Sequence, residues 1–595
     1  MKRQLLRLRP LPHRLPGVPF SAIHPSLTKS VHIQRRTYAS STAISTQETD
    51  VLIVGSGAGA LTAALTARKR GLHVTLIEKN STLGGASIIS GGGLWIPNNP
   101  ISKAAGVKDS VNAALSYFEQ AVGDVGQASS PERRAAFLDN GPKMVEFLQS
   151  LGFKFYFSVG YPDYYPLLQG AMGRGGGRTI ESKVFNEAVL GKSRRLLPPL
   201  AQPAAIYTND APVFTRMTSS IGAFSHATRR MAPLILRTIL GQKLSSMGRG
   251  LVARLLHLNI QQGTSINTEH AFVGLLTRDD GAVAGAEVQT RDGLLHIKSK
   301  SVILAAGGFA RNKTMREATL PSPASTEWTS VQAGDDGDAI RAGRAVGAET
   351  ALMDDAWWGP TIIDPLTNKP WFLLIERARP HCIMVDAEGS RFMNEAESYT
   401  DAGHHQYERN AKLKAIPCWL IMDATHRKRY MLGPKLFARM KIPQKALDEG
   451  RIFKADTLLS LASQIGVNPT GLTNTITRYN NMCKTGIDTD FQKGNNAYDN
   501  FFGDPKVKPN PNMGPIETGP FYAVPVWPGD LGTKGGLLTD EFQRVLRKDE
   551  SVIEGLYACG NTAAAIMGRT YLGAGSTLGP AMTHGFIAAN HLQKQ

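Results

Sequence analysis

The sequence predicts an α/β protein in which a parallel-sheet domain is built from both ends of the chain and a smaller α+β domain is inserted between them. Three apolar runs, 51–54, 301–306 and 555–558, each lead into a glycine turn. Strands that end in this way are typical of the carboxyl edge of a parallel sheet, where ligands approach. Because the first and last runs lie near opposite termini, we expect both ends to contribute strands to one sheet.

The first of these runs opens the most informative motif of the chain. An apolar strand at 51–54 is followed by a GxGxx(G/A) turn, a segment of helical spacing at 61–70, and a second strand at 73–77 that ends in Glu78. The residues of the turn are Gly55, Gly57, Gly59 and Ala60. In a Rossmann-type unit such a turn lets a pyrophosphate approach the backbone, and the acid binds the hydroxyls of an adenosine ribose. We therefore predict a dinucleotide site; the alternative is a glycine-rich turn that binds no ligand.

Other segments support the same organisation. A loop of small residues at 81–93 lies where the pyrophosphate and sugar chain of a dinucleotide would run. An amphipathic helix is predicted at 131–151, and strands at 271–277 and 282–289 are joined by an Asp-Asp-Gly turn as a hairpin.

Composition excludes several classes of protein. The 595 residues are 42% hydrophobic and 19% charged, and no run approaches the roughly 20 apolar residues of a membrane span. The four cysteines are scattered without a CxxC pair, which argues against a disulfide scaffold and against a structural zinc site. The net charge of +18 does not indicate nucleic-acid binding, because eight of the basic residues lie in the acid-free segment 1–47.

The composition of this N-terminal segment predicts a subcellular location. Residues 1–48 are rich in Arg, Ser and Pro, as mitochondrial transit peptides are. Arg36-Thr37-Tyr38, followed by Ala39-Ser40, resembles a matrix cleavage pattern. We expect mitochondrial import, with a disordered basic tail on a cytoplasmic protein as the alternative.

Five further motifs identify a family. They are Gly91-Gly92-Gly93-Leu94-Trp95-Ile96-Pro97, Pro162-Asp163-Tyr164-Tyr165, Arg391-Phe392-Met393-Asn394-Glu395, the segment 530–536 and the segment 571–579. Over 49–595 the chain resembles the flavoproteins of the fumarate reductase and 3-ketosteroid dehydrogenase superfamily, and most closely the 3-ketosteroid 1,2-dehydrogenases. The resemblance implies a Rossmann-type FAD-binding domain at 49–354 and 533–595, with a catalytic cap domain inserted at 355–532.

The resemblance also implies where FAD binds. Beyond the first turn and Glu78, the implied cofactor residues are Gly84, Gly85, Ala86, Ser87, Ser90, Gly91, Gly92, Ala306, Gly307, Asp338, Gly560, Asn561, Thr577 and Leu578. Succinate dehydrogenases attach FAD covalently through a histidine in the segment that corresponds to 79–100. Since this segment contains no histidine, we expect FAD to be bound non-covalently.

The residues of the cap predict which substrate the flavin meets. Fumarate reductases hold a dicarboxylate with two arginines and a histidine, at positions where this chain has Tyr399, Thr577 and Gly532. A buried carboxylate without cationic partners costs several kcal/mol. The site should therefore reject succinate and fumarate.

The groups that replace this clamp suit a neutral ketone. By resemblance, the Tyr571 hydroxyl and the Gly575 N–H group bind a substrate carbonyl and stabilise an enolate. Tyr399 then removes the C-2 proton, and Tyr164 hydrogen bonds to Tyr399 and favours its phenolate. A hydride passes from C-1 to the N-5 atom of the flavin, which supplies the redox chemistry.

Three features favour simpler interpretations. We expect Tyr165 to serve in packing, and His404 and His405 to lie in a solvated loop. The segment 210–269 contains seven cations and, between its end residues, no acid. It forms either a solvated helical face or, through 211–268, a patch that rests on an anionic membrane surface.

The leading hypothesis is an FAD-dependent 1,2-dehydrogenase of a 3-ketosteroid or 3-keto-triterpenoid. The alternatives are an ene-reductase or fumarate-type reductase, a ketosteroid dehydrogenase that desaturates C-4/C-5, and a lipid-binding flavoprotein without turnover. The electron acceptor, a quinone or oxygen, does not follow from the sequence.

Overall fold

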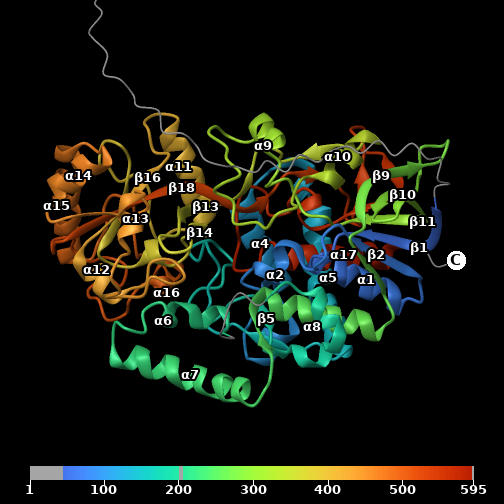
Figure 1. Ribbon diagram of the computed structural model, residues 1–595, viewed down its shortest axis with the longest axis horizontal. Helices are drawn as coiled ribbons and strands as arrows, with labels where there is room; N and C mark the ends of the chain where they lie inside the picture. Colours follow the sequence, from blue (N-terminus) through green and yellow to red (C-terminus); the bar gives the residue numbers. More distant parts are fainter. Residues whose placement is uncertain (1–44, 200–205, 593–595) are drawn as a thin grey trace, which may run out of the picture. The chain divides into compact units, whose positions relative to one another are not determined.

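In the computed structural model of the protein, which describes residues 45–199 and 206–592, both ends of the chain meet in one eight-stranded sheet (Figure 1). Its main order is β20 (Arg544–Leu546), β21 (Val552–Ala558), β11 (Gly293–Leu304), β1 (Ser45–Val54), β2 (Val74–Glu78) and β8 (Ser265–Thr268). β21, β11, β1, β2 and β8 run parallel, and β20 is antiparallel. The prediction that both ends form one parallel sheet is confirmed.

The hairpin is confirmed as well, because β9 (Ala271–Thr277) and β10 (Val283–Thr290) pair antiparallel, and β10 continues the sheet beside β11. One boundary differs from the prediction. The first strand begins at Ser45, and residues 45–49 pair with 295–299 of β11. The last residues of the predicted targeting segment 1–48 thus belong to the sheet, whereas residues 1–44 lie outside the described part of the chain.

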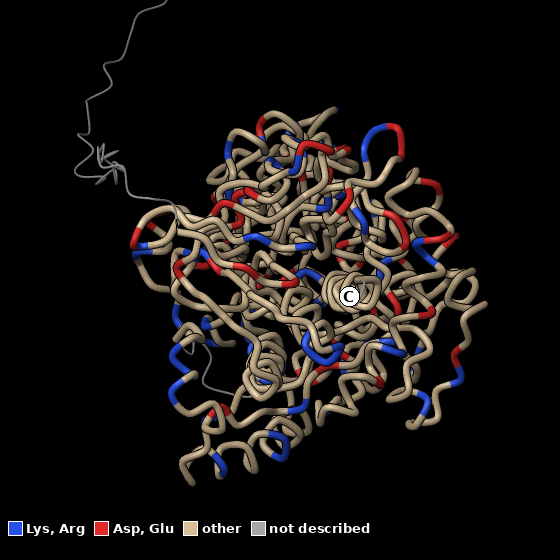
Figure 2. The backbone as a smooth tube through the Cα atoms, turned by 90° about the vertical axis from the view of Figure 1, so that its right-hand side faces the viewer, with Lys and Arg blue, Asp and Glu red and all other residues tan. Residues whose placement is uncertain are grey.

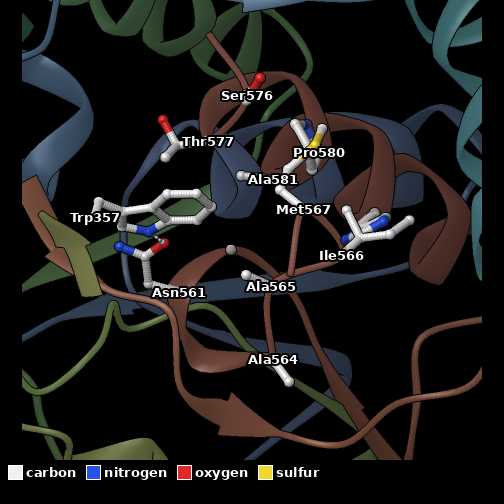
Figure 3. Close-up of a pocket in the computed structure, with 12 residues that line it drawn as sticks. Trp357, Asn561, Ala564, Ala565, Ile566, Met567, Ser576, Thr577, Pro580 and Ala581 are labelled. Carbon is white, nitrogen blue, oxygen red and sulfur yellow. Dashed lines mark hydrogen bonds between the residues drawn. The ribbon is translucent and has the colours of Figure 1, made fainter. Parts of the chain in front are cut away.

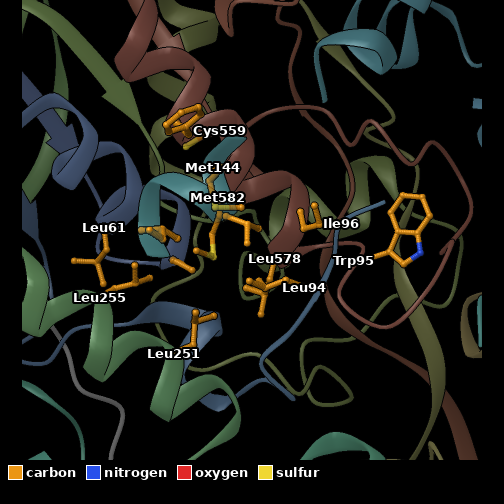
Figure 4. Close-up of a cluster of buried hydrophobic side chains, with 14 of the residues drawn as sticks. Leu61, Leu94, Trp95, Ile96, Met144, Leu251, Leu255, Cys559, Leu578 and Met582 are labelled. Carbon is orange, nitrogen blue, oxygen red and sulfur yellow. The ribbon is translucent and has the colours of Figure 1, made fainter. Parts of the chain in front are cut away.

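The apolar runs of the sheet are continuous because both of its faces are covered. Val51 and Ile53 of β1 belong to one apolar cluster, and Leu52 and Val54 belong to another. Three helices supply much of the first cluster: α1 (Ala58–Lys69), α8 (Met247–Gln261) and α17 (Leu578–His591). Figure 4 shows Leu61, Leu255 and Met582 from these helices together with Met144 of α5 (Pro131–Ser150).

The inserted segment has its own antiparallel sheet. Its order is β14 (Pro370–Phe372), β13 (Ala356–Ile363), β18 (Phe521–Thr533), β16 (Cys418–Met422) and β15 (Cys382–Val385), and β17 (Phe453–Ala455) also pairs with β18. Its helices are α11 (Tyr399–Asn410), α12 (Ala424–Arg429), α13 (Gln444–Asp448), α14 (Leu458–Ile465), α15 (Pro469–Thr485) and α16 (Ala497–Phe502). α11, whose first residue is Tyr399, packs against β13, and the ring of Tyr407 on this helix contacts that of Trp358 on the strand.

The segment 211–268 does not form one surface. It contains α6 (Ala211–Phe214), α7 (Ile221–Ile239) and β7 (Leu244–Ser245) before α8, and it ends in β8. α8 is largely buried and packs on α1, whereas α7 is largely exposed and runs along the lower edge of the view (Figure 1).

The remaining elements connect these parts. They are α2 (Gly85–Ile89), β3 (Gly93–Trp95), α3 (Pro100–Ala104), α4 (Val111–Val122), β4 (Phe155–Phe157), β5 (Thr179–Ser182), β6 (Phe185–Asn186), α9 (Lys313–Thr319), α10 (Asp338–Ala345), β12 (Thr350–Ala351) and β19 (Gly536–Leu537). Within 45–199 and 206–592, no helix combines the length and the apolar character that a membrane span needs. In the same residues no group of His, Cys, Asp and Glu side chains is placed to hold a metal ion.

Candidate active site

The first glycine turn joins β1 to α1 and leaves room for a phosphate. Gly55 has φ +105°, and a side chain there would collide with the Ala305 carbonyl oxygen, so this position requires glycine. Gly57 has φ −67° and caps α1, and the nearest atom to a Cβ there is Ser87 Oγ at 3.4 Å. The protein itself therefore does not require glycine at Gly57, whereas a phosphate approaching this helix N-terminus would.

Glu78 ends β2 in a buried position beside this turn. Its Oε2 accepts a hydrogen bond from Ser56 Oγ at 2.5 Å, and its Oε1 accepts from the Asn80 N–H at 2.9 Å and from Asn80 Nδ2 at 3.0 Å. A carboxylate offers about four lone-pair sites. About one lone-pair site of Glu78 therefore remains. It fits one ribose hydroxyl, whereas we expected Glu78 to bind both hydroxyls.

The small-residue loop forms α2 and the turns on either side of it. Ser87 Oγ accepts a hydrogen bond from the Ala58 N–H at 3.0 Å, which ties this loop to the start of α1. Ser90 Oγ accepts from the Gly92 N–H at 3.1 Å. Cβ atoms on Gly85 and Gly91 would meet open space, so both positions leave room for a bound group.

Two glycines that we assigned to the cofactor are required by packing within the protein itself. A Cβ on Gly59 would lie 2.7 Å from the Ala581 carbonyl oxygen of α17. A Cβ on Gly92 would collide with the backbone of Met247, where α8 begins. The sequence could not show this, because α17 and α8 are distant in the chain.

The turn after β11 is held by a buried carboxylate. Asp335 accepts hydrogen bonds from the Gly308 and Ala310 N–H groups, at 2.7 and 3.2 Å, and burial raises its pKa to about 6. This arrangement fixes Ala306 and Gly307 at the carboxyl edge of the sheet. The carboxylate of Asp338, by contrast, forms ion pairs with Lys79 Nζ at 2.6 Å and Arg341 Nη2 at 2.7 Å.

A pocket lies where the cap strand β13 meets the C-terminal part of the FAD-binding domain (Figure 3). Trp357 Nε1 donates to Asn561 Oδ1 at 3.2 Å on one side. Thr577, Pro580 and Ala581, from the first turn of α17 and the residue before it, line another side. Gly560 belongs to the lining, and Leu578 is the first residue of α17. Because a helix N-terminus favours negative charge, this end of the pocket suits the electron-rich part of a reduced flavin.

The three predicted tyrosines come together beside this pocket. Tyr399 begins α11 of the cap, Tyr571 lies in the loop before α17, and Tyr164 lies between β4 and β5. Their ring centroids are 4.9 Å apart for Tyr399 and Tyr571, 5.3 Å for Tyr164 and Tyr571, and 5.5 Å for Tyr164 and Tyr399. All three are buried. Three segments that are distant in sequence thus supply the three phenols, and Trp357 of β13 lies at the edge of this cluster.

The environment separates the phenols in acidity. Burial raises the pKa of Tyr399 well above its usual value, the neighbouring Tyr571 raises it further, and a hydrogen bond with Tyr164 lowers it. Burial also raises the pKa of Tyr571, but hydrogen bonds with the Thr577 hydroxyl, the Tyr399 hydroxyl and the backbone of Gly575 and Thr577 oppose the rise. Of these two phenols, the Tyr571 hydroxyl is therefore the stronger acid and the better hydrogen-bond donor.

Gly575 and Tyr164 are each held by the surrounding backbone. Gly575 has φ +101°, and a Cβ there would collide with the Gly93 carbonyl oxygen. Another residue at this position would therefore displace the backbone, and the N–H group would move with it. Tyr164 follows Asp163, whose carboxylate accepts hydrogen bonds from Trp95 Nε1 at 2.8 Å and Arg178 Nη1 at 2.9 Å.

Of two interpretations of side chains near the cluster, one was incomplete and the other was wrong. Tyr165 is more than packing: its hydroxyl donates to Asp401 Oδ1 at 3.0 Å, and the Tyr571 N–H donates to the Tyr165 oxygen at 3.4 Å. His404 and His405 lie in helix α11 and not in a solvated loop. The sequence did not reveal these contacts because Asp401 and Asp355 are distant in the chain from their partners, and Glu397 lies eight residues before His405, outside the helix.

Each of these histidines lies within hydrogen-bonding distance of a carboxylate. His404 Nε2 lies 2.8 Å from Asp355 Oδ1, and His405 Nδ1 lies 2.7 Å from Glu397 Oε1. The hydrogen bond to Glu397 raises the pKa of His405 to about 9, and burial raises the pKa of Glu397 to about 7. Both pairs anchor α11, which carries Tyr399.

Comparison with known proteins gives consistent matches. Residues 50–578 match the family described as FAD binding domain. A 3-oxosteroid 1-dehydrogenase of Mycobacterium tuberculosis (strain ATCC 25618 / H37Rv) is 41% identical over 566 residues, which cover 92% of this chain and 99% of the relative. A 4-oxocyclohexanecarboxylate 2-dehydrogenase of Sinomonas cyclohexanicum is 36% identical and covers 92% and 93%.

The fold matches a solved structure equally well. The crystal structure of 3-ketosteroid delta1-dehydrogenase from Sterolibacterium denitrificans, in complex with 1,4-androstadiene-3,17-dione, has a TM-score of 0.86 and 38% identity, covering 92% of this chain and 99% of that chain. These matches extend across the FAD-binding part and the cap alike. The predicted fold class and the FAD cofactor are thereby confirmed, and the chain belongs to the 3-oxosteroid 1-dehydrogenase family of FAD-binding oxidoreductases.

Proposed function

We propose that the protein desaturates the C-1/C-2 bond of a 3-ketosteroid or 3-keto-triterpenoid. The observation that carries this proposal is the buried phenolic cluster of Tyr399, Tyr571 and Tyr164 at the edge of the pocket. The rings of Phe372 and Trp357 complete its surroundings, at 5.0 Å from Tyr399 and 5.5 Å from Tyr571. Such a site offers neutral hydrogen-bond donors in an apolar environment, as an uncharged ring ketone requires.

Each polar group has one role in this reaction. The Tyr571 hydroxyl and the Gly575 N–H group donate hydrogen bonds to the C-3 carbonyl oxygen, on which negative charge develops. Tyr399 takes the C-2 proton as its phenolate, and the hydrogen bond with Tyr164 lowers the pKa of Tyr399 and so favours that phenolate. When bound, FAD supplies the acceptor for the hydride that leaves C-1. Proton and hydride together account for the two hydrogens lost.

The pKa order of the cluster determines the sequence of events. Because burial holds the pKa of Tyr399 well above its usual value, only a small fraction of its hydroxyl has released its proton to solvent near neutral pH. That phenolate removes the C-2 proton, which the carbonyl bound to Tyr571 and Gly575 acidifies, and the enolate forms as the Tyr399 hydroxyl is restored. The relatives support this chemistry, since their names describe dehydrogenation beside a ring ketone.

Four further properties belong to the same proposal. FAD is bound non-covalently, because residues 79–100 contain no histidine. The electron acceptor is a quinone or oxygen, and the hydrophobic substrate reaches the site from a lipid phase. The protein is imported into mitochondria through the basic segment 1–48, with a cytoplasmic location as the alternative.

Product analysis tests the proposed reaction. A 5α-saturated 3-ketosteroid offers both C-1/C-2 and C-4/C-5 to the enzyme. We expect a product two mass units lighter whose double bond, located by NMR, lies at C-1/C-2. A double bond at C-4/C-5 would show the alternative regiochemistry, and no product from any 3-ketone would contradict the proposal.

A further inference from the structure

Helix α7 presents an apolar face to solvent. The most exposed side chains on it are Ile221 at 89% and Ile239 at 75%, and Phe224, Ile235 and Leu236 are also about half exposed or more. Large apolar side chains gathered in this way mark an interaction surface when they form one patch. The helix contacts mainly α6 and β7, its neighbours along the chain.

The sequence periodicity of α7 separates this face from the one that packs inward. With 3.6 residues per turn, Ala223, Ala227 and Leu234 fall on one side, and each of them is buried or half-buried. Ile221, Phe224, Ile235 and Ile239 recur at helical spacing on the other side, and all are exposed. We call these four residues the outward face. It extends over a helix about 28 Å long.

The charges of the segment divide into two groups. Four of the seven cations in 211–268 form ion pairs or hydrogen bonds with other side chains of the protein. Arg216 pairs with Asp504, Arg230 with Asp210 and Arg249 with Glu187, and Arg254 hydrogen bonds to Ser182. The membrane patch predicted from all of 211–268 is therefore too large.

The cations that remain lie at α7. Arg229 and Lys243 are exposed and form no ion pair within the described residues, and Arg237 is bonded only to Gln242. α7, at the lower edge of Figure 2, carries basic residues and no acidic one. An anionic surface therefore complements the outward face, whereas a second copy of α7 would bring like charges together.

The segment 206–220, which precedes α7, is hydrogen bonded both to the FAD-binding domain and to the cap. On one side Thr208 donates its N–H to Glu181 of β5 at 3.1 Å and its hydroxyl to the Gly91 carbonyl oxygen at 3.0 Å. On the other, Arg379 of the cap donates to the Pro212 carbonyl oxygen at 2.6 Å. α7 is thus held at the junction of the FAD loop and the cap.

We propose that the outward face of α7 docks on an anionic lipid bilayer. The apolar side chains enter the acyl boundary, while Arg229 and Lys243 contact the phosphate groups of the lipids. This inference rests on the proposed function in one respect, because a membrane next to the FAD–cap junction would deliver a water-insoluble ketone to the site.

The test is sedimentation of the full-length holoenzyme with lipid vesicles. We expect binding to phosphatidylglycerol–phosphatidylcholine vesicles that weakens in high salt, and much weaker binding to pure phosphatidylcholine. Ile235→Glu, Ile239→Glu and Arg229→Glu should each weaken binding by roughly tenfold or more. Leu459→Glu, at an equally exposed leucine on α14, is the matched control and should bind as wild type does.

Three results would overturn the proposal. They are wild-type protein that stays in the supernatant with anionic vesicles, a control variant that loses binding as strongly as the α7 variants, and a stable dimer that Ile239→Glu dissociates. Thermal unfolding of each variant shows whether it is folded. Wild-type turnover of steroid delivered from cyclodextrin tests the proposed function alone, so either proposal can fail without the other.

Discussion

Replacement of Tyr399 by Phe removes one hydroxyl and leaves the ring in place. The ring keeps its contacts with Phe372 at 5.0 Å, Tyr571 at 4.9 Å and Tyr164 at 5.5 Å. Loss of a buried hydroxyl changes stability by about 1–2 kcal/mol at most, so the variant should fold and retain FAD. If Tyr399 is the base, turnover should fall by roughly 10² to 10⁴, or about 2.7–5.5 kcal/mol in the activation free energy.

The Tyr571→Phe variant is the comparison that makes this result specific. It removes one of the two donors to the carbonyl oxygen, for which a fall of about 10² to 10³ is expected. Turnover alone does not separate these ranges. Exchange of the C-2 proton with solvent deuterium does, when it is measured in D₂O with hydride transfer blocked.

Exchange should cease in Tyr399→Phe, because no base remains at C-2. It should persist weakly in Tyr571→Phe, because the base is present and only the enolate is less stable. Wild-type exchange in Tyr399→Phe would refute the assignment, and Tyr164, whose ring lies 5.5 Å from Tyr399, would be the next residue to replace.

Three further predictions follow from the same geometry. Gly57→Val should give colourless protein of normal stability, because only a pyrophosphate requires glycine there. The control Gly274→Val, whose Cβ meets open space, should stay yellow, and flavin bound in both variants would contradict this prediction. Burial raises the pKa of Tyr399, so its phenolate forms mainly at alkaline pH. We therefore expect kcat/KM to rise through the alkaline range in the wild type and to lose this slope in Tyr399→Phe. A flat wild-type profile would count against Tyr399 as the base. Deletion of residues 1–38 leaves β1 intact and should abolish mitochondrial import without loss of activity, and a cytosolic fluorescent fusion of 1–48 would disprove the address.

The parts of the fold that depend on local pattern were predictable from the sequence. Strand, glycine turn, helix and acid follow one another between residues 51 and 78, and β1, α1 and β2 appear there with boundaries shifted by a few residues. The phenolic cluster was placed by family resemblance, since nothing local in Tyr164 or Tyr571 distinguishes it from a packed tyrosine.

The remainder depends on contacts between distant segments. Arg249 was assigned to a surface because the sequence shows its charge but not the buried face of α8, where Glu187 pairs with it at 2.6 Å. Tyr165 meets Asp401 only because the cap folds back over the loop after β4. Burial and long-range pairing arise from the tertiary fold, so no spacing rule could have revealed them.

Anaerobic reduction of the bound flavin tests the central claim most directly, because it isolates substrate oxidation from the unknown acceptor. Mixing the oxidised holoenzyme with a saturated 3-ketosteroid should bleach the flavin absorbance, whereas the matching 3-alcohol and succinate should not. The ketone alone acidifies C-2 beside Tyr399, and the site lacks the cations that hold a dicarboxylate. Bleaching by succinate at a comparable rate, or none with any 3-ketone, would contradict the account.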